Sequence, residues 1–331
     1  MHPLEAASNF NESMYFNLFD HEQKLGLWLR LGNRPNEGHA EMSCCVYLPD
    51  GRIGFMYQRP DIDHNNSFDA AGMQFEVINP MQALNARYHG MLCLLGDPQQ
   101  MLNPGKAFSS NPIVSANIDL RFTALAPAFG GEPVDEHGKA IEQDPETSFA
   151  RGHYEQHMQG VGEITVGNQS LRINGFGLRD HSWGPRYWQN IHWYRWLPLV
   201  FNQDLAMMLS IVTLRNGHSV NWGMVMRRDS DGAVINDPVT SIQLNSEYDD
   251  QYQAQAQTAR IVTEAGVEYE LQGQALSSIP LRNRRKDSEG NSLHTRITEA
   301  MTRFTCNGQT GFGMAEYLDQ MIDNKPVGYP Q

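Results

Sequence analysis

The fold class is decided by one stretch of the sequence, GEITVGNQSLRING, at residues 162–175. Apolar and polar side chains alternate on both sides of Gly167-Asn168, and these two residue types favour the positive φ angles of tight hairpin turns. The stretch therefore predicts two antiparallel strands joined by a turn. The same alternation around turn residues recurs at 45–57, 207–227, 260–273 and 304–318.

This pattern dominates the chain. Many short strands at regular spacing, without long helical periodicity between them, are typical of antiparallel sandwiches and barrels. One short helix is expected near residues 80–87, where Met81, Leu84 and Tyr88 have helical spacing. We therefore predict an all-β protein with few short helices.

The length of 331 residues allows one large or two medium-sized domains. A polar, acidic stretch containing Gly and Pro, GGEPVDEHGKAIEQDPETSFA at 130–150, lies between apolar, strand-like segments. We interpret this stretch as a linker. The sequence thus predicts an N-terminal β domain over residues 1–150 and a C-terminal β domain over residues 151–331.

Composition excludes several classes of partner. There are 38 acidic and 25 basic side chains, a formal charge of −13, and the basic residues are not clustered as a phosphate backbone requires. No apolar stretch approaches the roughly 18–20 residues that span a bilayer. The N-terminus shows no signal peptide, and the four cysteines form no C-x-x-C pair, so a cytoplasmic protein without a disulfide framework is expected.

The sequence also lacks the common cofactor motifs. It has no G-x-S-x-G elbow, no P-loop and no H-E-x-x-H, and its two G-x-G segments, at 160–162 and 311–313, fall within predicted hairpins. His153 and His157 suggest a metal site, but four residues along a strand separate them by about 13 Å. We expect no cofactor and no metal.

One segment concentrates chemically active side chains. Residues 176–196 read FGLRDHSWGPRYWQNIHWYRW and contain four of the six tryptophans. If Gly175 forms a β-bulge that resets the strand phase, Asp180 points into the core while Arg179 and His181 point away from it. A carboxyl group surrounded by indole rings has a raised pKa and can donate a proton near neutral pH.

Structural roles compete with this hypothesis. Asp180 could instead cap a turn or pair with Arg179 or Arg186, and the tryptophans could be ordinary core. Other carboxylates also lie in strand-like contexts, among them Glu155, Glu299 and Glu316, where surface or ion-paired positions are the usual outcome.

The segment GFGLRDHSWGPR, at 175–186, resembles the two-domain lipocalin-like superfamily, which includes carotenoid 1,2-hydratase, AttH-like proteins and bacterial relatives with an R-D-H-S-W-G-x-R motif. The stretches at 11–20, 119–127 and 311–319 are also similar to that group. The resemblance implies two consecutive β-barrel-like domains that enclose an apolar cavity. Its members include hydratases of isoprenoid double bonds, terpenoid cyclases and pericyclases, and in the hydratases an aspartate is assigned as the proton donor.

The leading hypothesis is a cofactor-independent enzyme that hydrates, dehydrates, isomerises or cyclises a small apolar, isoprenoid-like molecule. Asp180 would be the general acid, with His181 or His192 as a base or orienting group. Aromatic and charged side chains of the same segment and of nearby strands would contact the substrate. These are Trp183, Arg186, Trp188, Trp193, Tyr194, Trp196, Glu155 and Trp222.

Two other functions remain open. A non-enzymatic carrier of a hydrophobic metabolite would use the same aromatic cavity without a proton donor. A pericyclase would act by shape and hydrogen bonding instead of proton transfer. The oligomeric state is not indicated by the sequence.

Overall fold

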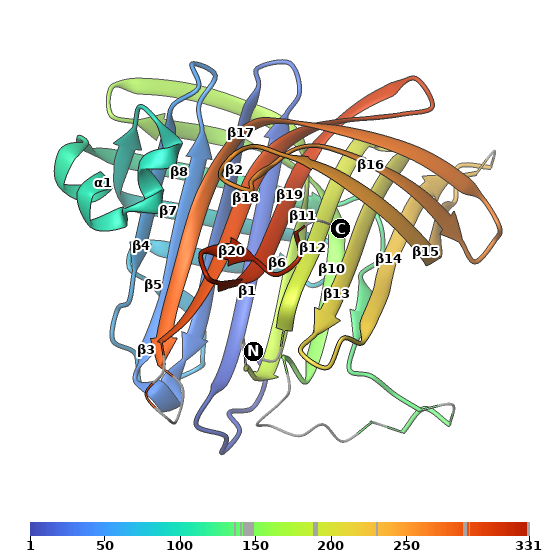
Figure 1. Cartoon of the computed structure of the whole chain (residues 1–331), viewed down its shortest axis with the longest axis horizontal. Helices are drawn as coiled ribbons and strands as arrows, with labels where there is room; N and C mark the ends of the chain where they lie inside the picture. Colours follow the sequence, from blue (N-terminus) through green and yellow to red (C-terminus); the bar gives the residue numbers. More distant parts are fainter. Residues whose placement is uncertain are drawn as a thin grey trace. The chain divides into compact units, whose positions relative to one another are not determined.

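The computed structural model describes residues 1–135, 137–139, 141, 149–187, 191–229, 231–286, 290 and 292–329. The chain is 69% strand and 5% helix, arranged in two antiparallel sheets, which confirms the all-β prediction (Figure 1). Within the described residues, no helix is both long and apolar enough to cross a membrane.

The chain divides into two compact units, the first formed by residues 1–96 and 108–190 and the second by residues 97–107 and 191–331. The first unit contains eleven strands and the 3-10 turn η1. They are β1 (Phe10–Asp20), β2 (Leu25–Arg34), η1 (Pro35–Glu37), β3 (His39–Tyr47), β4 (Ile53–Gln58), β5 (Phe68–Ala70), β6 (Met73–Asn79), β7 (Ala83–Leu95), β8 (Ile113–Ala124), β9 (Phe129–Gly131), β10 (Gly152–Val166) and β11 (Gln169–Pro185).

The sheet of the first unit runs β4-β3-β2-β1-β11-β10-β8-β7-β6-β5, and β9 pairs with β10. A three-residue pairing between β4 and β7, from Ile53 opposite Leu95 to Phe55 opposite Cys93, closes the path into a ring. The N-terminal strand β1 thereby lies between β2 and the much later strand β11.

The second unit contains a nine-stranded sheet in sequence order from β12 to β20, and a β12–β19 pairing closes eight of these strands into a barrel. The turn η2 and the first residues of helix α1 belong to this unit. Its elements are η2 (Pro98–Leu102), α1 (Pro104–Ser110), β12 (Ile191–Asn202), β13 (Leu205–Leu214), β14 (Ser219–Arg228), β15 (Val234–Tyr248), β16 (Ala254–Thr263), β17 (Glu268–Lys286), β18 (Ser292–Cys306), β19 (Gln309–Ile322) and β20 (Lys325–Pro326).

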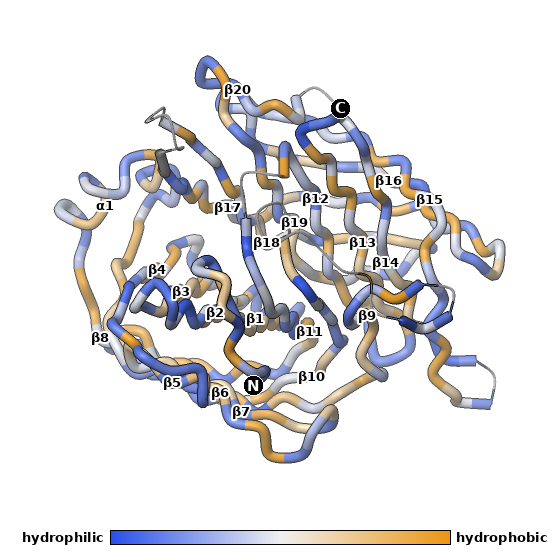
Figure 2. The backbone as a smooth tube through the Cα atoms, turned by 90° about the horizontal axis from the view of Figure 1, so that it is seen from below, coloured by the Kyte–Doolittle hydropathy of each residue, from blue (hydrophilic) through white to orange (hydrophobic). Residues whose placement is uncertain are grey.

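Alternating side chains build each core, and Figure 2 shows the alternation of hydrophilic and hydrophobic residues along the strands. In β2, Leu25, Leu27, Leu29 and Leu31 all point into the apolar core of the first ring, because residues two apart in a strand share a face. Leu197, Leu199 and Phe201 of β12 do the same in the second unit.

The predicted hairpins are confirmed. The quoted stretch 162–175 falls within β10 and β11, which turn at Gly167-Asn168, and Gly167 has a φ of +59°. The other four predicted hairpins are β3–β4, β13–β14, β16–β17 and β18–β19. Short-range alternation and turn residues were sufficient for these elements.

The two compact units do not divide at the predicted boundary of 150/151. Strands β10 and β11 pair with β8 and β1 of the first unit, so the chain changes unit at residue 190/191, and the D-H-S-W-G motif lies in the first unit. Much of the expected linker at 130–150 lies outside the described residues.

The predicted helix at 80–87 is wrong. Those residues form the turn between β6 and β7 and the beginning of β7, where Ala83 and Leu84 lie opposite Thr123 and Phe122 of β8. Among the residues that the structure describes, the α-helix is α1, which no sequence pattern noted above predicts.

We predict that Gly177→Ala weakens the first unit, because β1 and β11 approach too closely for a side chain there. A Cβ at Gly177 would lie 1.9 Å from the carbonyl oxygen of Asn17. Relieving this clash should lower the free energy of unfolding by about 1–3 kcal/mol in denaturant titrations. Gly96→Ala, where the added Cβ meets nothing within 4 Å, is the control and should change it by less than about 0.5 kcal/mol. Equal effects of the two variants would contradict the close approach.

Candidate functional site

The register of β11 against β1 separates the chemically active residues onto two faces of the sheet. Arg179 lies opposite Phe16 and His181 opposite Met14, and both partners belong to the apolar core of the ring. Arg179, His181 and Trp183 therefore occupy the inner face, while Asp180 occupies the outer face.

This arrangement reverses the orientation predicted for Asp180, Arg179 and His181. Gly175 lies opposite Gly160 in an unbroken ladder with β10, so no bulge resets the phase there. The glycine serves a different purpose, because a Cβ at this position would lie 2.1 Å from the carbonyl oxygen of Phe19. The close approach of β1 to β11 therefore explains why residue 175 is a glycine.

The outer face carries a group of three titratable side chains, His153, Glu155 and Asp180, which we call the His153 cluster. Nε2 of His153 forms a very short contact with Oδ2 of Asp180 and lies 3.4 Å from Oε1 of Glu155. Glu155 lies directly opposite Asp180 in the β10–β11 ladder and is fully buried. One imidazole is therefore flanked by two carboxylates.

Burial and charge pairing act in opposite directions on the pKa values of His153 and Asp180. Burial opposes the charged form of His153, but the facing carboxylates of Asp180 and Glu155 outweigh it and raise the pKa of the imidazole. Burial alone would raise the pKa of Asp180. The charge of His153, and to a smaller extent that of Arg186, instead holds this pKa below its usual value. The predicted raised pKa of Asp180 is therefore wrong, and it is the pKa of its partner His153 that is raised.

Arg186 joins this end of β11. It donates a short hydrogen bond to Oγ of Ser182, which in turn lies 3.0 Å from Oγ of Ser13. The guanidinium also lies over the ring of Phe149, 4.3 Å from its centroid. Arg186 thus adds positive charge beside Asp180, as its effect on the Asp180 pKa shows.

Aromatic side chains continue the outer face next to the cluster. Tyr15 lies directly opposite Asp180 on β1, and Trp28 on β2 lies 6.1 Å from Tyr15 by ring centroids. Phe55 stands a further 6.1 Å from Trp28, whose indole N–H donates to Oη of Tyr47 at 3.3 Å. Tyr15, Trp28, Tyr47 and Phe55 form what we call the aromatic row, and all four are buried.

No sequence pattern marks His153, Tyr15 or Trp28 as a site residue. The spacing of His153 and His157 suggests a metal pair, but His157 belongs to neither group of converging ligands in the described residues. The missing information was pairing, because β1 and β11 lie more than 150 residues apart in the chain. Alternation within 11–20 placed Tyr15 on one face but could not supply its partner.

The inner face holds a second polar group, which we call the Glu12 cluster: His2, Glu12 and His181. Nδ1 of His2 and Nε2 of His181 each lie 2.9 Å from Oε1 of Glu12, and Asn65 donates to Oε2 at 2.5 Å. Burial opposes ionisation of Glu12, yet these hydrogen bonds, that from His181 foremost, lower its pKa to about 2. Burial lowers the pKa of His181 despite its bond to Glu12.

Neighbouring side chains fix the imidazoles of the Glu12 cluster. Oη of Tyr154 lies 3.0 Å from Nδ1 of His181. The indole of Trp183 stacks on His2 with ring centroids 3.9 Å apart and donates to Glu132 at 3.0 Å. His181 and Trp183, predicted as a catalytic partner and a cavity wall, thus lie on the opposite face of β11 from Asp180.

All but one of the remaining predicted residues belong to the second unit. His192, Trp193, Tyr194 and Trp196 lie on β12 and Trp222 on β14. Trp188 lies outside the described residues.

Within the second unit these residues also divide between two faces. Trp193 lies opposite Asp319, on the side of the buried Arg195–Asp319 ion pair, whose closest contact is 3.2 Å. Trp196 and Trp222 both lie opposite Ser210 on the other face, and Tyr194 donates a short hydrogen bond to Glu316 there. Glu299, on the next strand, lies opposite Glu316.

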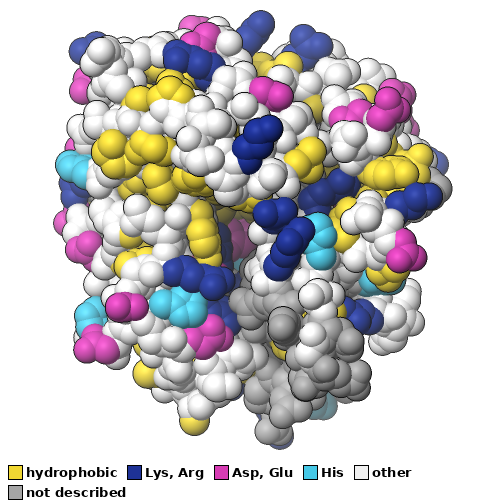
Figure 3. Space-filling view, turned by 60° about the vertical axis from the view of Figure 1, so that its left-hand side comes forward, with side chains coloured by type: hydrophobic (Ala, Val, Ile, Leu, Met, Phe, Trp, Pro, Cys, Tyr) yellow, Lys and Arg dark blue, Asp and Glu magenta, His cyan; other side chains and the backbone are white. Residues whose placement is uncertain are grey.

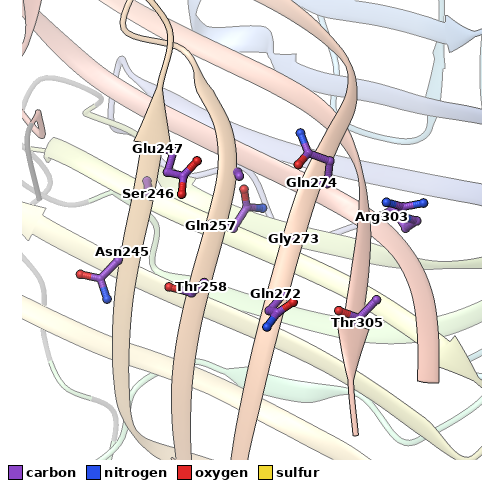
Figure 4. A pocket seen from close by; sticks show the side chains of 11 residues that line it. Asn245, Ser246, Glu247, Gln257, Thr258, Gln272, Gly273, Gln274, Arg303 and Thr305 are labelled. Carbon is purple, nitrogen blue, oxygen red and sulfur yellow. The ribbon is translucent and has the colours of Figure 1, made fainter. Parts of the chain in front are cut away.

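A groove of about 450 Å³ crosses β15 to β18 on the second unit (Figure 4). Figure 4 shows amide, hydroxyl and charged side chains around it, including Gln257, Gln272 and Arg303. Figure 3 shows acidic and basic side chains interspersed on the face that it displays. Its lining is mostly polar, whereas the aromatic row beside the His153 cluster is built from buried aromatic rings.

Comparisons with known proteins agree with the fold. The model of a family described as a domain of unknown function (DUF7064) matches residues 1–321. A search of curated proteins finds no match to the sequence. Among solved structures, a protein assigned as AttH from Nitrosomonas europaea has a TM-score of 0.51 at 14% identity, with 96% of each chain covered.

Two further structures share this architecture. CghA in complex with Sch210972 has a TM-score of 0.55 at 10% identity, covering 94% of this chain and 89% of that one. Kievitone hydratase from Nectria haematococca has a TM-score of 0.53 at 10% identity, covering 96% and 93%. The expected two-domain lipocalin-like resemblance is confirmed at the level of fold.

We predict that Asp180→Asn destabilises the protein in a pH-dependent way. Because the pKa of His153 is raised on folding, its ion pair stabilises the protein fully below about pH 6.5, and this stabilisation is lost as pH rises through the folded-state pKa. Because the pKa of Asp180 is lowered on folding, its contribution to stability is present only above about pH 4. Thermal or denaturant unfolding should show a loss of about 1.5–3 kcal/mol at pH 6 and a smaller loss at pH 9.

The matched control is Asp119→Asn, because that carboxylate is 62% exposed in the same unit. Its effect should stay within about 0.5 kcal/mol at both pH values. Equal destabilisation by Asp180→Asn at pH 6 and pH 9 would contradict the charged pair.

Proposed function

The chain belongs to the family described as a domain of unknown function (DUF7064), and we propose that it is an enzyme that performs acid/base chemistry on a small apolar, isoprenoid-like molecule. The observation that carries the proposal is the His153 cluster beside the aromatic row. A protonated imidazole held between two carboxylates is a proton donor near neutral pH. Buried aromatic rings next to it suit an apolar ligand.

His153 is the general acid in this mechanism, in place of the predicted Asp180. The imidazolium transfers its proton to one carbon of a double bond, and the positive charge forms on the other carbon. The ring faces of Tyr15 and Trp28 stabilise that charge through their quadrupoles. Asp180 keeps the imidazole charged and oriented, as a carboxylate that accepts its hydrogen bond.

The fate of the cation decides the product. In hydration, water adds to the cation and returns one proton to the cluster, with Glu155 or neutral His153 as the base. Loss of a different carbon-bound proton gives an isomer. Attack by a second double bond forms a ring and a new carbocation, which then loses a carbon-bound proton to Glu155 or to neutral His153. Each sequence restores the proton to the protein, so no cofactor is consumed.

The fold comparisons support this class of reaction. Kievitone hydratase is by its name a hydratase, and the CghA structure holds the small molecule Sch210972. Both similarities are at 10% identity and concern the fold, so the proposed reaction rests on the His153 cluster. The substrate contacts predicted at Trp193, Tyr194, Trp196 and Trp222 remain predictions.

We predict that His153→Gln abolishes turnover. The protein is incubated in D₂O with kievitone and with a panel of linear polyenes, and deuterium gained at carbon is followed by mass spectrometry. Removing a general acid should slow the reaction by about 10²–10⁴-fold. The control is His89→Gln, because His89 is an exposed histidine of the same unit and should leave the rate unchanged.

The pH profile separates Asp180 from His153. Activity should fall as pH rises through the raised pKa of His153. In Asp180→Asn this fall in activity should occur at lower pH, because the carboxylate that raises the pKa of His153 is gone. Unchanged turnover in His153→Gln would reject the mechanism. A rate that is flat between pH 5 and 9 would indicate a pericyclase, and ligand bound without turnover would indicate a carrier.

A further inference from the structure

We propose that the Glu12 cluster binds one divalent transition-metal ion, with Zn²⁺ as the expected occupant. His2, Glu12 and His181 come from the N-terminal segment, β1 and β11 and converge on the inner face of the first ring. One ligand atom from each of the three side chains lies within 4.8 Å of the others.

The donor set matches zinc chemistry. Two imidazole nitrogens and one carboxylate oxygen form a three-ligand zinc site that leaves a further position for water. Ligands about 2.0–2.2 Å from a tetrahedral zinc ion stand about 3.3 Å apart. The imidazole nitrogens of His2 and His181 already lie 2.9 Å from Oε1 of Glu12, so small side-chain movements would admit the ion.

A second layer of contacts holds these ligands. Tyr154 reaches the other ring nitrogen of His181 at 3.0 Å, and Asn65 donates to the second oxygen of Glu12. Trp183 stacks on His2 and fixes the plane of its ring. Such outer partners orient histidine and carboxylate ligands in metal sites and strengthen metal binding.

The His153 cluster is a poorer metal site, although its three groups also converge. It offers one imidazole and two carboxylates, a donor set with fewer of the nitrogen ligands that zinc favours, and its imidazole is already paired with Asp180. The Glu12 cluster combines a fully buried carboxylate with a His2 side chain that is 35% exposed. An ion can therefore reach the buried ligand from the His2 side.

The ion would join residue 2, which precedes β1, to β11 on the far side of the sheet from the His153 cluster. Binding to the folded state alone stabilises that state by mass action. The proposed acid/base reaction does not use the ion, so each proposal can fail without the other.

The test uses the full chain with no residues added before Met1, stripped by a chelator and titrated with Zn²⁺ and with Co²⁺. We expect one equivalent in native mass spectra, a ligand-field band with Co²⁺ and a zinc-dependent rise in unfolding temperature. His2→Ala should weaken binding by at least about 100-fold, and Tyr154→Phe by about 10–100-fold. His64→Ala, at an exposed histidine of the same unit, should bind as the unmodified chain does.

Several results would overturn the proposal. Absence of a stoichiometric ion at micromolar zinc would show that the cluster is a hydrogen-bonded group only. Equal affinity in the unmodified chain and His2→Ala would place any bound zinc elsewhere. The unfolding temperature of each metal-free variant shows whether it is folded, and Tyr154→Phe tests the site with all three ligands retained.

Discussion

The pairing of β1 with β11 is the constraint on which both polar clusters depend. Because Tyr15 lies opposite Asp180 and Met14 opposite His181, successive residues of β11 face opposite sides of one sheet. A shift of one residue would exchange the faces, placing Asp180 in the apolar core and His181 on the outer face. Gly175 and Gly177 permit this pairing, since a Cβ at either position would collide with a β1 carbonyl oxygen.

Charge balance explains why the outer cluster is suited to proton transfer. A buried imidazolium alone would lose its proton, and two buried carboxylates alone would take one up. Placed together, Asp180 and Glu155 raise the pKa of His153, and His153 with Arg186 lowers the pKa of Asp180. The raised pKa belongs to the group whose ordinary pKa is nearest to neutrality, and the buried rings of Tyr15 and Trp28 lie on the same face of the sheet.

Local sequence patterns predicted the strands, but which side chains meet at the site depends on how distant strands pair. The hairpin at 162–175 was predictable because alternation and a Gly-Asn turn are short-range signals. The helix expected near Met81, Leu84 and Tyr88 failed because a turn followed by a strand can show the same apolar spacing. Gly175 was interpreted as a bulge, whereas it allows close packing on Phe19. The β10 partner of Asp180, Glu155, follows from extending the predicted hairpin in register. Its β1 partner, Tyr15, lies 165 residues away, and a single sequence does not bring the two together.

The most direct test of the account is the titration of the His153 imidazole, followed by NMR of histidine-labelled protein and assigned by the signal missing in His153→Gln. The account predicts a pKa above the ordinary histidine value of about 6.5, and a lower pKa in Asp180→Asn. A pKa at or below about 6.5 that does not respond to Asp180→Asn would contradict the claim that the two carboxylates hold a proton on His153.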